Sequence, residues 1–248
     1  NSINWARIMA QIVYYFWASL RLGGPSKAIS FSVPTGNFGD IFAGYLAHKM
    51  GLPIKQLIIA TNQNDILHRC ISNNDHTTKP LEQSLAPSMD IMISSNFERL
   101  LFDLYHHDGE EITRLMSDSK AGDMRLSDSA LVMARELFSS FRCDDSDMVE
   151  VIRKTNIEND YLLDPHTAIG LLAARNCRID HDTPMVTLAT AHPAKFPEAV
   201  KRAGYPRDPE LPSHVADLFD RDEYFTVLDD DQNQVHQFMK VNISESSL

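Results

Sequence analysis

Cysteine is scarce in this sequence, and its spacing excludes two kinds of scaffold. The 248 residues contain three cysteines, Cys70, Cys143 and Cys177, which lie far apart and show no Cys-x-x-Cys spacing. Neither a disulfide framework nor a zinc cluster is indicated by this pattern. The adjacent His106 and His107 show no ligand spacing either, so we expect no bound metal. So few and isolated thiols are typical of a reducing compartment, and we expect a cytoplasmic protein.

Long hydrophobic runs and an excess of positive charge are also missing. No apolar run reaches the roughly 18 residues that a membrane span needs, and we expect neither a span nor a signal peptide. The chain has 23 Lys+Arg against 34 Asp+Glu, a net charge of −11. A broad surface for nucleic acid or anionic lipid is therefore disfavoured. The carboxylates between Asp208 and Asp231 are interpreted as a solvated face.

Short apolar runs alternate with helical patterns along the rest of the chain. Ala28–Val33, Gln56–Ala60 and Pro184–Ala189 predict strands, whereas the periodicity of residues 3–21 and 38–50 predicts amphipathic helices. Strands separated by helices favour a parallel sheet. We therefore predict an α/β fold with an open, mostly parallel sheet and helices on both faces.

Several side chains have the character of helix caps. Ser2 or Asn4 precedes the first helix, and Asn62 precedes a helix that runs through Cys70. Ser95 to Glu98 has the pattern of a capping box. Further caps are predicted at the following positions: Ser127, Asp144 and Asp164, the last one followed by Pro165.

The order of these elements predicts a division of the chain. A polar segment from Ser72 to Ser88 interrupts the alternation, and the chain then reads as successive helices. We expect residues 1–90 and 160–205 to form one large domain. Residues 91–159 would be an added helical insertion, and residues 206–248 an acidic tail with a short helix near Ser213 to Phe219.

One strand-to-helix junction has the composition of a phosphate site. Gly36, Asn37, Phe38 and Gly39 follow the first strand, with Asp40 opening the next helix. Unpaired backbone N–H groups at a helix N-terminus bind phosphate. The loop matches neither Gly-x-x-x-x-Gly-Lys-Ser/Thr nor Gly-x-Gly-x-x-Gly, which disfavours nucleoside triphosphates and dinucleotides. A small phosphate monoester, such as that of a cofactor, remains; an ordinary turn is the equal alternative.

Two further groups of residues are candidates for ligand contact. Arg7 lies in the first turn of a helix with Ser2 and Asn4 nearby, a donor set suited to a phosphate; from the sequence alone, contact with solvent or a carboxylate is the better interpretation. A second group follows the last predicted strand, where ligands of open sheets bind. Its members are Thr190, His192 and Lys195, whose alternatives are a turn hydroxyl, a loop histidine and a solvated lysine.

A set of motifs in a fixed order gives the chain a resemblance to a known family. The segments run from Asn1 to about Gly204 and are NSINWARIMAQIVYYF, SVPTGNFGDIFAGYLAHKMGLP, IIATNQND, SMDI, DPHTAIG and TAHPAKF. In this order and at these separations the chain resembles the carboxyl-terminal part of threonine synthase.

The resemblance implies a fold-type-II pyridoxal-phosphate enzyme, similar in fold to the β subunit of tryptophan synthase. Such an enzyme converts O-phospho-L-homoserine and water to L-threonine and phosphate, the last step of threonine biosynthesis. It implies that Gly36, Asn37, Phe38, Gly39 and Asp40 bind the phosphate of pyridoxal 5'-phosphate. Thr190 would face the pyridine nitrogen. The implied site for the substrate phosphate is a set of three residues: Asn1, Ser2 and Arg7.

Two segments that the resemblance implies are missing. No lysine here is preceded by Phe or followed by Asp, and there is no Ser-Gly-Asp-Thr-Gly loop. We expect the Schiff-base lysine upstream of Asn1, in a longer protein of which this chain is an inactive fragment. Two alternatives stay open. One is another fold-type-II enzyme, such as a phospholyase or dehydratase; the other is a non-catalytic module that binds a phosphorylated metabolite. The sequence does not predict an oligomeric state.

Overall fold

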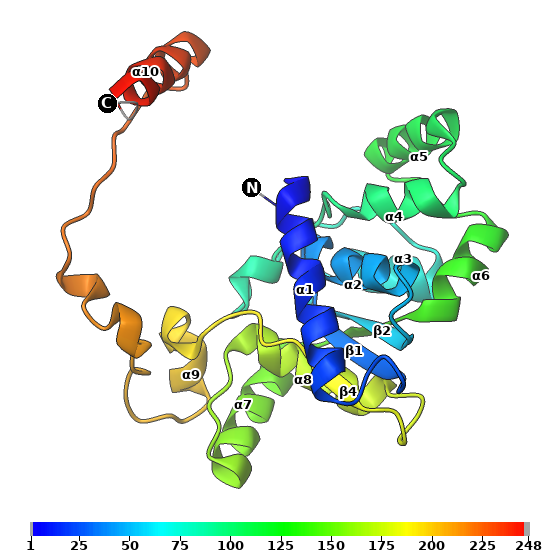
Figure 1. The fold of residues 1–248 in the computed structure, drawn as a ribbon, viewed down its shortest axis with the longest axis horizontal. Coiled ribbons are helices and arrows are strands. Elements are labelled where there is room, and N and C mark those ends of the chain that lie inside the picture. Colours follow the sequence, from blue (N-terminus) through cyan, green and yellow to red (C-terminus); the bar gives the residue numbers. More distant parts are fainter. Residues whose placement is uncertain (1, 246–248) are drawn as a thin grey trace. The chain divides into compact units, whose positions relative to one another are not determined.

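The computed structural model describes residues 2–245, and a parallel sheet lies at the centre of the part that ends at Pro209 (Figure 1). Within these residues the order of the strands is β3-β2-β1-β4, and each neighbouring pair is parallel. The bounds of the strands are β1 (Ile29–Pro34), β2 (Ile54–Thr61), β3 (Phe138–Arg142) and β4 (Met185–Thr187). The predicted parallel sheet is thus confirmed.

Helices occupy most of the chain between the strands. In chain order they are α1 (Trp5–Arg21), α2 (Gly39–Lys49), α3 (Ile66–Asn73), η1 (Pro87–Met89), α4 (Phe97–Leu104), α5 (Gly109–Ala121), α6 (Asp128–Leu137), α7 (Asp145–Asn159), α8 (Pro165–Cys177), η2 (Pro193–Lys195) and α9 (Pro197–Arg202).

Successive side chains of a strand point to opposite faces of the sheet, where they pack into two separate cores. Phe31 and Leu57 are buried on the face covered by α1 and α2, whereas Ile58 packs with α7 and α8 on the other face. On β1 the small residue Ser32 lies between apolar neighbours, and its hydroxyl donates to the backbone carbonyl of Gly170 at 2.6 Å. This allows α8 to approach the sheet closely. Helices on both faces, as predicted, are confirmed.

The edge strand β3 corrects the prediction that residues 91–159 are helical throughout. Its sequence, Phe-Ser-Ser-Phe-Arg, is short and half polar, a weak strand signal after a helix. It pairs with β2 from Phe138 opposite Leu57 to Arg142 opposite Thr61. Long-range pairing with a buried strand, rather than local propensity, decides its structure.

Three of the predicted caps are confirmed by hydrogen bonds. The side chain of Asn4 accepts from the N–H of Ala6, and that of Ser127 accepts from Ala130. Asp164 accepts from the N–H groups of His166 and Thr167, with Pro165 at the first helical position. Asp144 occupies the N-cap position of α7 without a side-chain cap bond.

Two other predicted caps are wrong because their side chains bind elsewhere. Helix α3 begins at Ile66 after Asp65, and the buried Asn62 donates instead to Ser84 and Asp90. Helix α4 begins at Phe97 after Asn96, not after Ser95. Buried polar groups thus form a network between loops, and a capping pattern does not reveal such a network.

The residues from Glu210 onward form a second compact unit by contacts within the chain. It contains η3 (Ser213–Val215), η4 (Leu218–Asp220) and α10 (Gln232–Glu245). The short helix predicted near Ser213 to Phe219 is therefore split in two, and α10 was not predicted. Among residues 2–245, none of the helices has the length and apolarity needed to cross a membrane.

Candidate functional site

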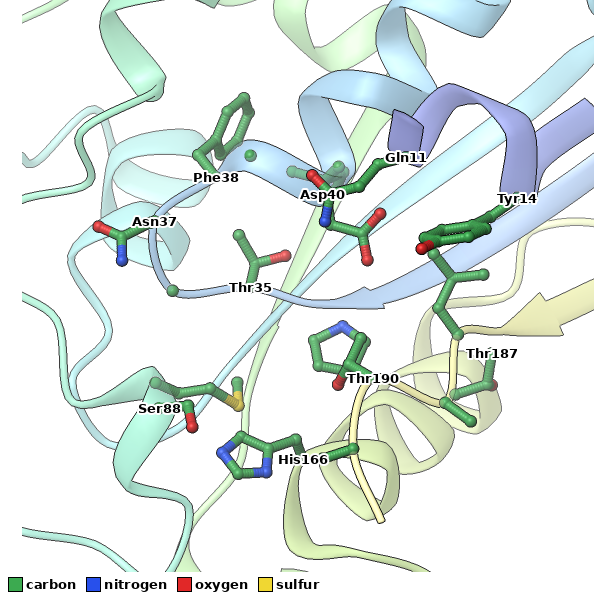
Figure 2. A pocket seen from close by; sticks show the side chains of 18 of the residues that line it. Gln11, Tyr14, Thr35, Asn37, Phe38, Asp40, Ser88, His166, Thr187 and Thr190 are labelled. Carbon is green, nitrogen blue, oxygen red and sulfur yellow. The ribbon is translucent and has the colours of Figure 1, made fainter. Parts of the chain in front are cut away.

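A cavity of about 1060 Å³ opens at the carboxyl ends of β1 and β4 (Figure 2). These strands are parallel neighbours, with Ser32 opposite Thr187, so the loops that follow them meet at the same edge of the sheet. The cavity is lined from five parts of the chain: one side of α1 with the residues before it, the glycine loop, η1, the start of α8, and the end of β4 with the segment that follows it. The glycine loop and the segment after β4 therefore share one rim of the sheet.

The glycine loop turns the chain from β1 into α2 through a left-handed residue. Phe38 has φ 66°, and its ring is buried edge-on against Phe97, with 5.2 Å between the ring centroids. A Cβ on Gly36 would lie 2.8 Å from the carbonyl oxygen of Ser88, so no larger residue fits there. The first bond of α2 runs from the N–H of Phe42 to Phe38. The preceding N–H groups have no carbonyl within the helix and lie beside the cavity.

Residues just before α4 fix this loop, and sequence reasoning missed their role. The hydroxyl of Ser94 donates to the carbonyl of Gly36 at 2.6 Å. The fully buried Asn96 donates through Nδ2 to the carbonyls of Asn37 at 3.0 Å and Ser2 at 2.9 Å. One amide therefore joins the glycine loop to the beginning of the chain. A capping-box pattern marked this segment, but its partners are distant in sequence.

The residues predicted to bind the substrate phosphate differ in placement. Ser2 and Arg7 line the cavity. Arg7 is exposed, and within residues 2–245 its guanidinium makes no ion pair or hydrogen bond, although its charge lowers the pKa of Asp40. Asn4 is used as the cap of α1. Asn1 lies outside the described residues.

Asp40 places an acidic group in the same cavity. Burial raises the pKa of its carboxyl to about 6, although the hydroxyl of Tyr15 and the charge of Arg7 act in the opposite direction. The Tyr15 hydroxyl donates to the backbone carbonyl of Asp40 at 2.8 Å, and burial in turn raises the pKa of this phenol. The pKa of this carboxyl therefore lies closer to neutral pH than that of an ordinary surface aspartate.

The segment after β4 contributes two of its three predicted residues to the cavity. Thr190 is exposed and lines it, opposite the end of β1 in Figure 2. Lys195 also lines it, with Nζ 5.7 Å from the ring centroid of Phe196. His192 instead caps η2 and accepts from the N–H of Ala194 at 3.2 Å.

His166 is a cavity residue to which sequence reasoning gave no role. It is 3% exposed, its Nδ1 lies 3.0 Å from Oδ1 of Asp164, and its ring centroid is 4.5 Å from that of Phe196. Burial alone would raise the pKa of Asp164, but hydrogen bonds from His166 and Thr167 hold it below its ordinary value. A histidine directly after Asp-Pro, at a helix start within an apolar segment, is the signal that could have identified it.

Comparison with known proteins points to one family. A family model described as "Threonine synthase, C-terminal" matches residues 167–239. A curated threonine synthase from Pseudomonas aeruginosa is 57% identical over 240 residues, covering 96% of this chain and 51% of the relative. One from Corynebacterium glutamicum is 39% identical, covering 100% of this chain and 53% of the relative.

Solved structures agree with the curated relatives. The PLP-bound threonine synthase from Brucella melitensis has a TM-score of 0.90 at 51% identity, covering 96% of this chain and 51% of that one. The threonine synthase from yeast has a TM-score of 0.83 at 39% identity over 90% of this chain and 49% of that one. The chain thus spans about half the length of the proteins it matches, and the predicted fold-type-II architecture is confirmed. The chain belongs to the threonine synthase family and is similar to the carboxyl-terminal part of its members.

Proposed function

We propose that the protein carrying this chain is a pyridoxal-phosphate-dependent threonine synthase that converts O-phospho-L-homoserine and water to L-threonine and phosphate. Membership of the family supports the activity. The observation that carries the proposal for this chain is a single cavity shared by a glycine loop, an unpaired arginine and Thr190. The partner is a small molecule, and we place the protein in the cytoplasm.

The glycine loop fits the phosphate of pyridoxal phosphate. Gly36 packs so closely against the backbone of Ser88 that a Cβ would clash, so main-chain atoms line the cavity there. The first N–H groups of α2 and the positive end of its dipole favour an anion. We assign this role to the backbone of Gly36, Asn37, Phe38, Gly39 and Asp40; the buried ring of Phe38 takes no part.

Arg7 and Ser2 fit a second phosphate, that of the substrate. A guanidinium without an ion-pair partner among the described residues, in the first turn of α1, leaves a charge to be balanced by a ligand. Asn96 fixes the carbonyls of Ser2 and Asn37, which supports two anion sites at a constant separation. Asn1 belongs to this proposed site by its position in the motif alone.

Thr190 completes the proposed cofactor site. Its hydroxyl is neutral, and it would hydrogen-bond a pyridine nitrogen without requiring that nitrogen to be protonated. Pyridoxal phosphate supplies an electron sink for carbanions formed on amino-acid substrates. Since no lysine of this sequence stands in a Phe-Lys-Asp segment, we assign the lysine to residues outside it and infer that residues 1–248 alone are inactive.

The proposal is tested on protein expressed from the complete reading frame. Phosphate release from O-phospho-L-homoserine and threonine formation are measured for wild type, Arg7→Ala and Arg21→Ala. Arg21 lies in the last turn of the same helix, stacked on Trp17 at 5.1 Å, and does not line the cavity. Loss of a charge-assisted bond of about 1.5–3 kcal/mol predicts a KM roughly 10- to 100-fold higher for Arg7→Ala, with Arg21→Ala unchanged.

Other outcomes select the alternatives. Elimination from another phosphorylated amino acid, without threonine from O-phospho-L-homoserine, would favour a related phospholyase or dehydratase. Binding of a phosphorylated metabolite without turnover by a colourless protein from the complete reading frame would favour a non-catalytic module. Equal KM values for the two arginine variants would remove Arg7 from the substrate site.

A further inference from the structure

One polar atom in the wall of the cavity has no role in the site described above. Within residues 2–245, Nε2 of His166 is buried and has no hydrogen-bond partner. The ring itself lines the cavity, near Ser88 and Thr190 (Figure 2). Buried polar atoms of side chains are nearly always hydrogen-bonded, and leaving one unpaired costs stability. The unpaired nitrogen therefore indicates a partner that the polypeptide itself does not supply.

The other side of the ring fixes which nitrogen carries the proton. Asp164 accepts from the backbone N–H of His166 at 2.9 Å, from the Thr167 hydroxyl, and lies 3.0 Å from Nδ1. An ionised carboxylate only accepts, so Nδ1 must donate. In the neutral ring Nε2 then presents its lone pair. This arrangement of carboxylate, Nδ1–H and free Nε2 is suited to taking up a proton.

Packing holds the ring in this orientation. Phe196 lies against it with ring centroids 4.5 Å apart, and His166 sits at the second position of a 13-residue helix. The other ionisable side chains that line the cavity are Arg7, Tyr14, Asp40 and Lys195. None of these is recorded in a hydrogen bond to His166 among the described residues. No other ionisable side chain of the cavity therefore occupies Nε2.

We propose that Nε2 of His166 is a proton acceptor of this cavity, and that Asp164 is its positioning residue. An O–H or N–H group of the bound substrate, or of a water beside it, gives its proton to Nε2. The bond from hydrogen to oxygen or nitrogen breaks, its electron pair stays on that atom, and an Nε2–H bond forms. The imidazolium charge is balanced by the Asp164 carboxylate, and the proton later leaves to solvent. The identity of the substrate rests on the function proposed above.

The kinetic test compares three histidine variants in protein from the complete reading frame. His166→Gln puts an amide near the position of Nε2 but cannot take up a proton, and His166→Asn keeps a donor for Asp164 while removing Nε2. His76→Gln is the matched control, because His76 is also buried, stacks on Phe97 and does not line the cavity. We expect kcat to fall roughly 10²- to 10⁴-fold in both His166 variants, with KM little changed, and no loss in the control.

A measurement on the wild type makes the test independent of turnover and of the variants' folding. In protein with ¹⁵N-labelled histidine, the His166 resonances report which ring nitrogen is protonated, before and after addition of inorganic phosphate and pyridoxal 5'-phosphate. We expect a protonated Nδ1 and an Nε2 signal that moves when these ligands bind. A protonated Nε2 with a bare Nδ1, an Nε2 signal that does not respond, or full kcat in His166→Gln would each overturn the inference. Absence of threonine formation by the wild type would reject the proposed function alone, because the resonances still decide the role of Nε2.

Discussion

Replacement of Asn96 tests whether the glycine loop and the beginning of the chain are held in position by the same buried amide. Its Nδ2 donates to the carbonyls of Ser2 at 2.9 Å and Asn37 at 3.0 Å, and its Oδ1 accepts from Nε of Arg99 at 3.1 Å. The side chain has no exposed surface. Asn96→Ala removes these three bonds, and a longer one from Nδ2 to the hydroxyl of Ser95 at 3.5 Å, without adding volume.

The expected loss of stability depends on which polar groups lose their last hydrogen-bond partner. The carbonyl of Asn37 also accepts from the backbone N–H of Asn96 at 3.1 Å, and Arg99 also donates to the carbonyl of Ile3. Among residues 2–245, only the carbonyl of Ser2 is left without a donor. One such group costs about 1–3 kcal/mol, so we expect the free energy of unfolding to fall by that amount. Asn96→Asp should cost more, since a carboxylate would face two carbonyl oxygens.

The assay is urea unfolding of protein from the complete reading frame, followed by circular dichroism, with and without inorganic phosphate. Asn176→Ala is the control, because Asn176 is exposed and its amide makes only a bond to Leu172 within its own helix. Surface substitutions of this kind change stability by about 0.5 kcal/mol or less. The reasoning is refuted if Asn96→Ala is as stable as Asn176→Ala. A lower stability with unchanged phosphate affinity would restrict Asn96 to a structural role.

Three further predictions concern packing and pH. In Gly170→Ala the new Cβ would lie 3.0 Å from Thr187 and 3.1 Å from Pro34, so thermal unfolding should show a loss of stability of about 1–3 kcal/mol. Gly109→Ala, where the new Cβ would have open space around it, should show no loss of stability. The pKa of Asp40 is about 6 in the folded protein against 3.8 without burial; ionisation therefore opposes folding above pH 6, and Asp40→Asn should raise the urea midpoint at pH 8 but not below pH 3.8. Burial lowers the pKa of His76 from 6.5 to about 4, so wild type should lose stability as pH falls through this interval, and His76→Gln should lose less.

The elements predicted correctly are those whose signals are local. Apolar runs with clear boundaries predicted β1 and β2, and side chains next to a helix start predicted the caps at Asn4, Ser127 and Asp164. The shared rim follows from parallel pairing, because β1 and β4 end at the same edge. Each of these inferences needed only neighbouring residues or a general rule of sheet topology.

The missed features depend on partners far along the chain. Strand β3 is decided by pairing with β2, about 80 residues earlier, as with Thr61 and Phe141. Asn96 binds backbone groups 59 and 94 residues away. A single sequence gives no information on which distant carbonyl a buried amide will meet, so these residues were interpreted as local caps. Their real partners became visible only in the folded chain.

Hydrogen bonds from buried side chains give the cavity a rigid frame, whereas its exposed side chains are not fixed in this way. Arg7 and Thr190 are exposed, and within residues 2–245 the side chain of neither makes a hydrogen bond, so both side chains are free to adjust to a ligand. The backbone and the imidazole that they face are instead fixed by Asn96 and Asp164, both of which are buried. Buried hydrogen bonds are costly to break, since the groups released find no water. We therefore expect substitution of Asn96 to weaken phosphate binding, and substitution of Asp164 to lower kcat with KM little changed, as expected for His166 itself.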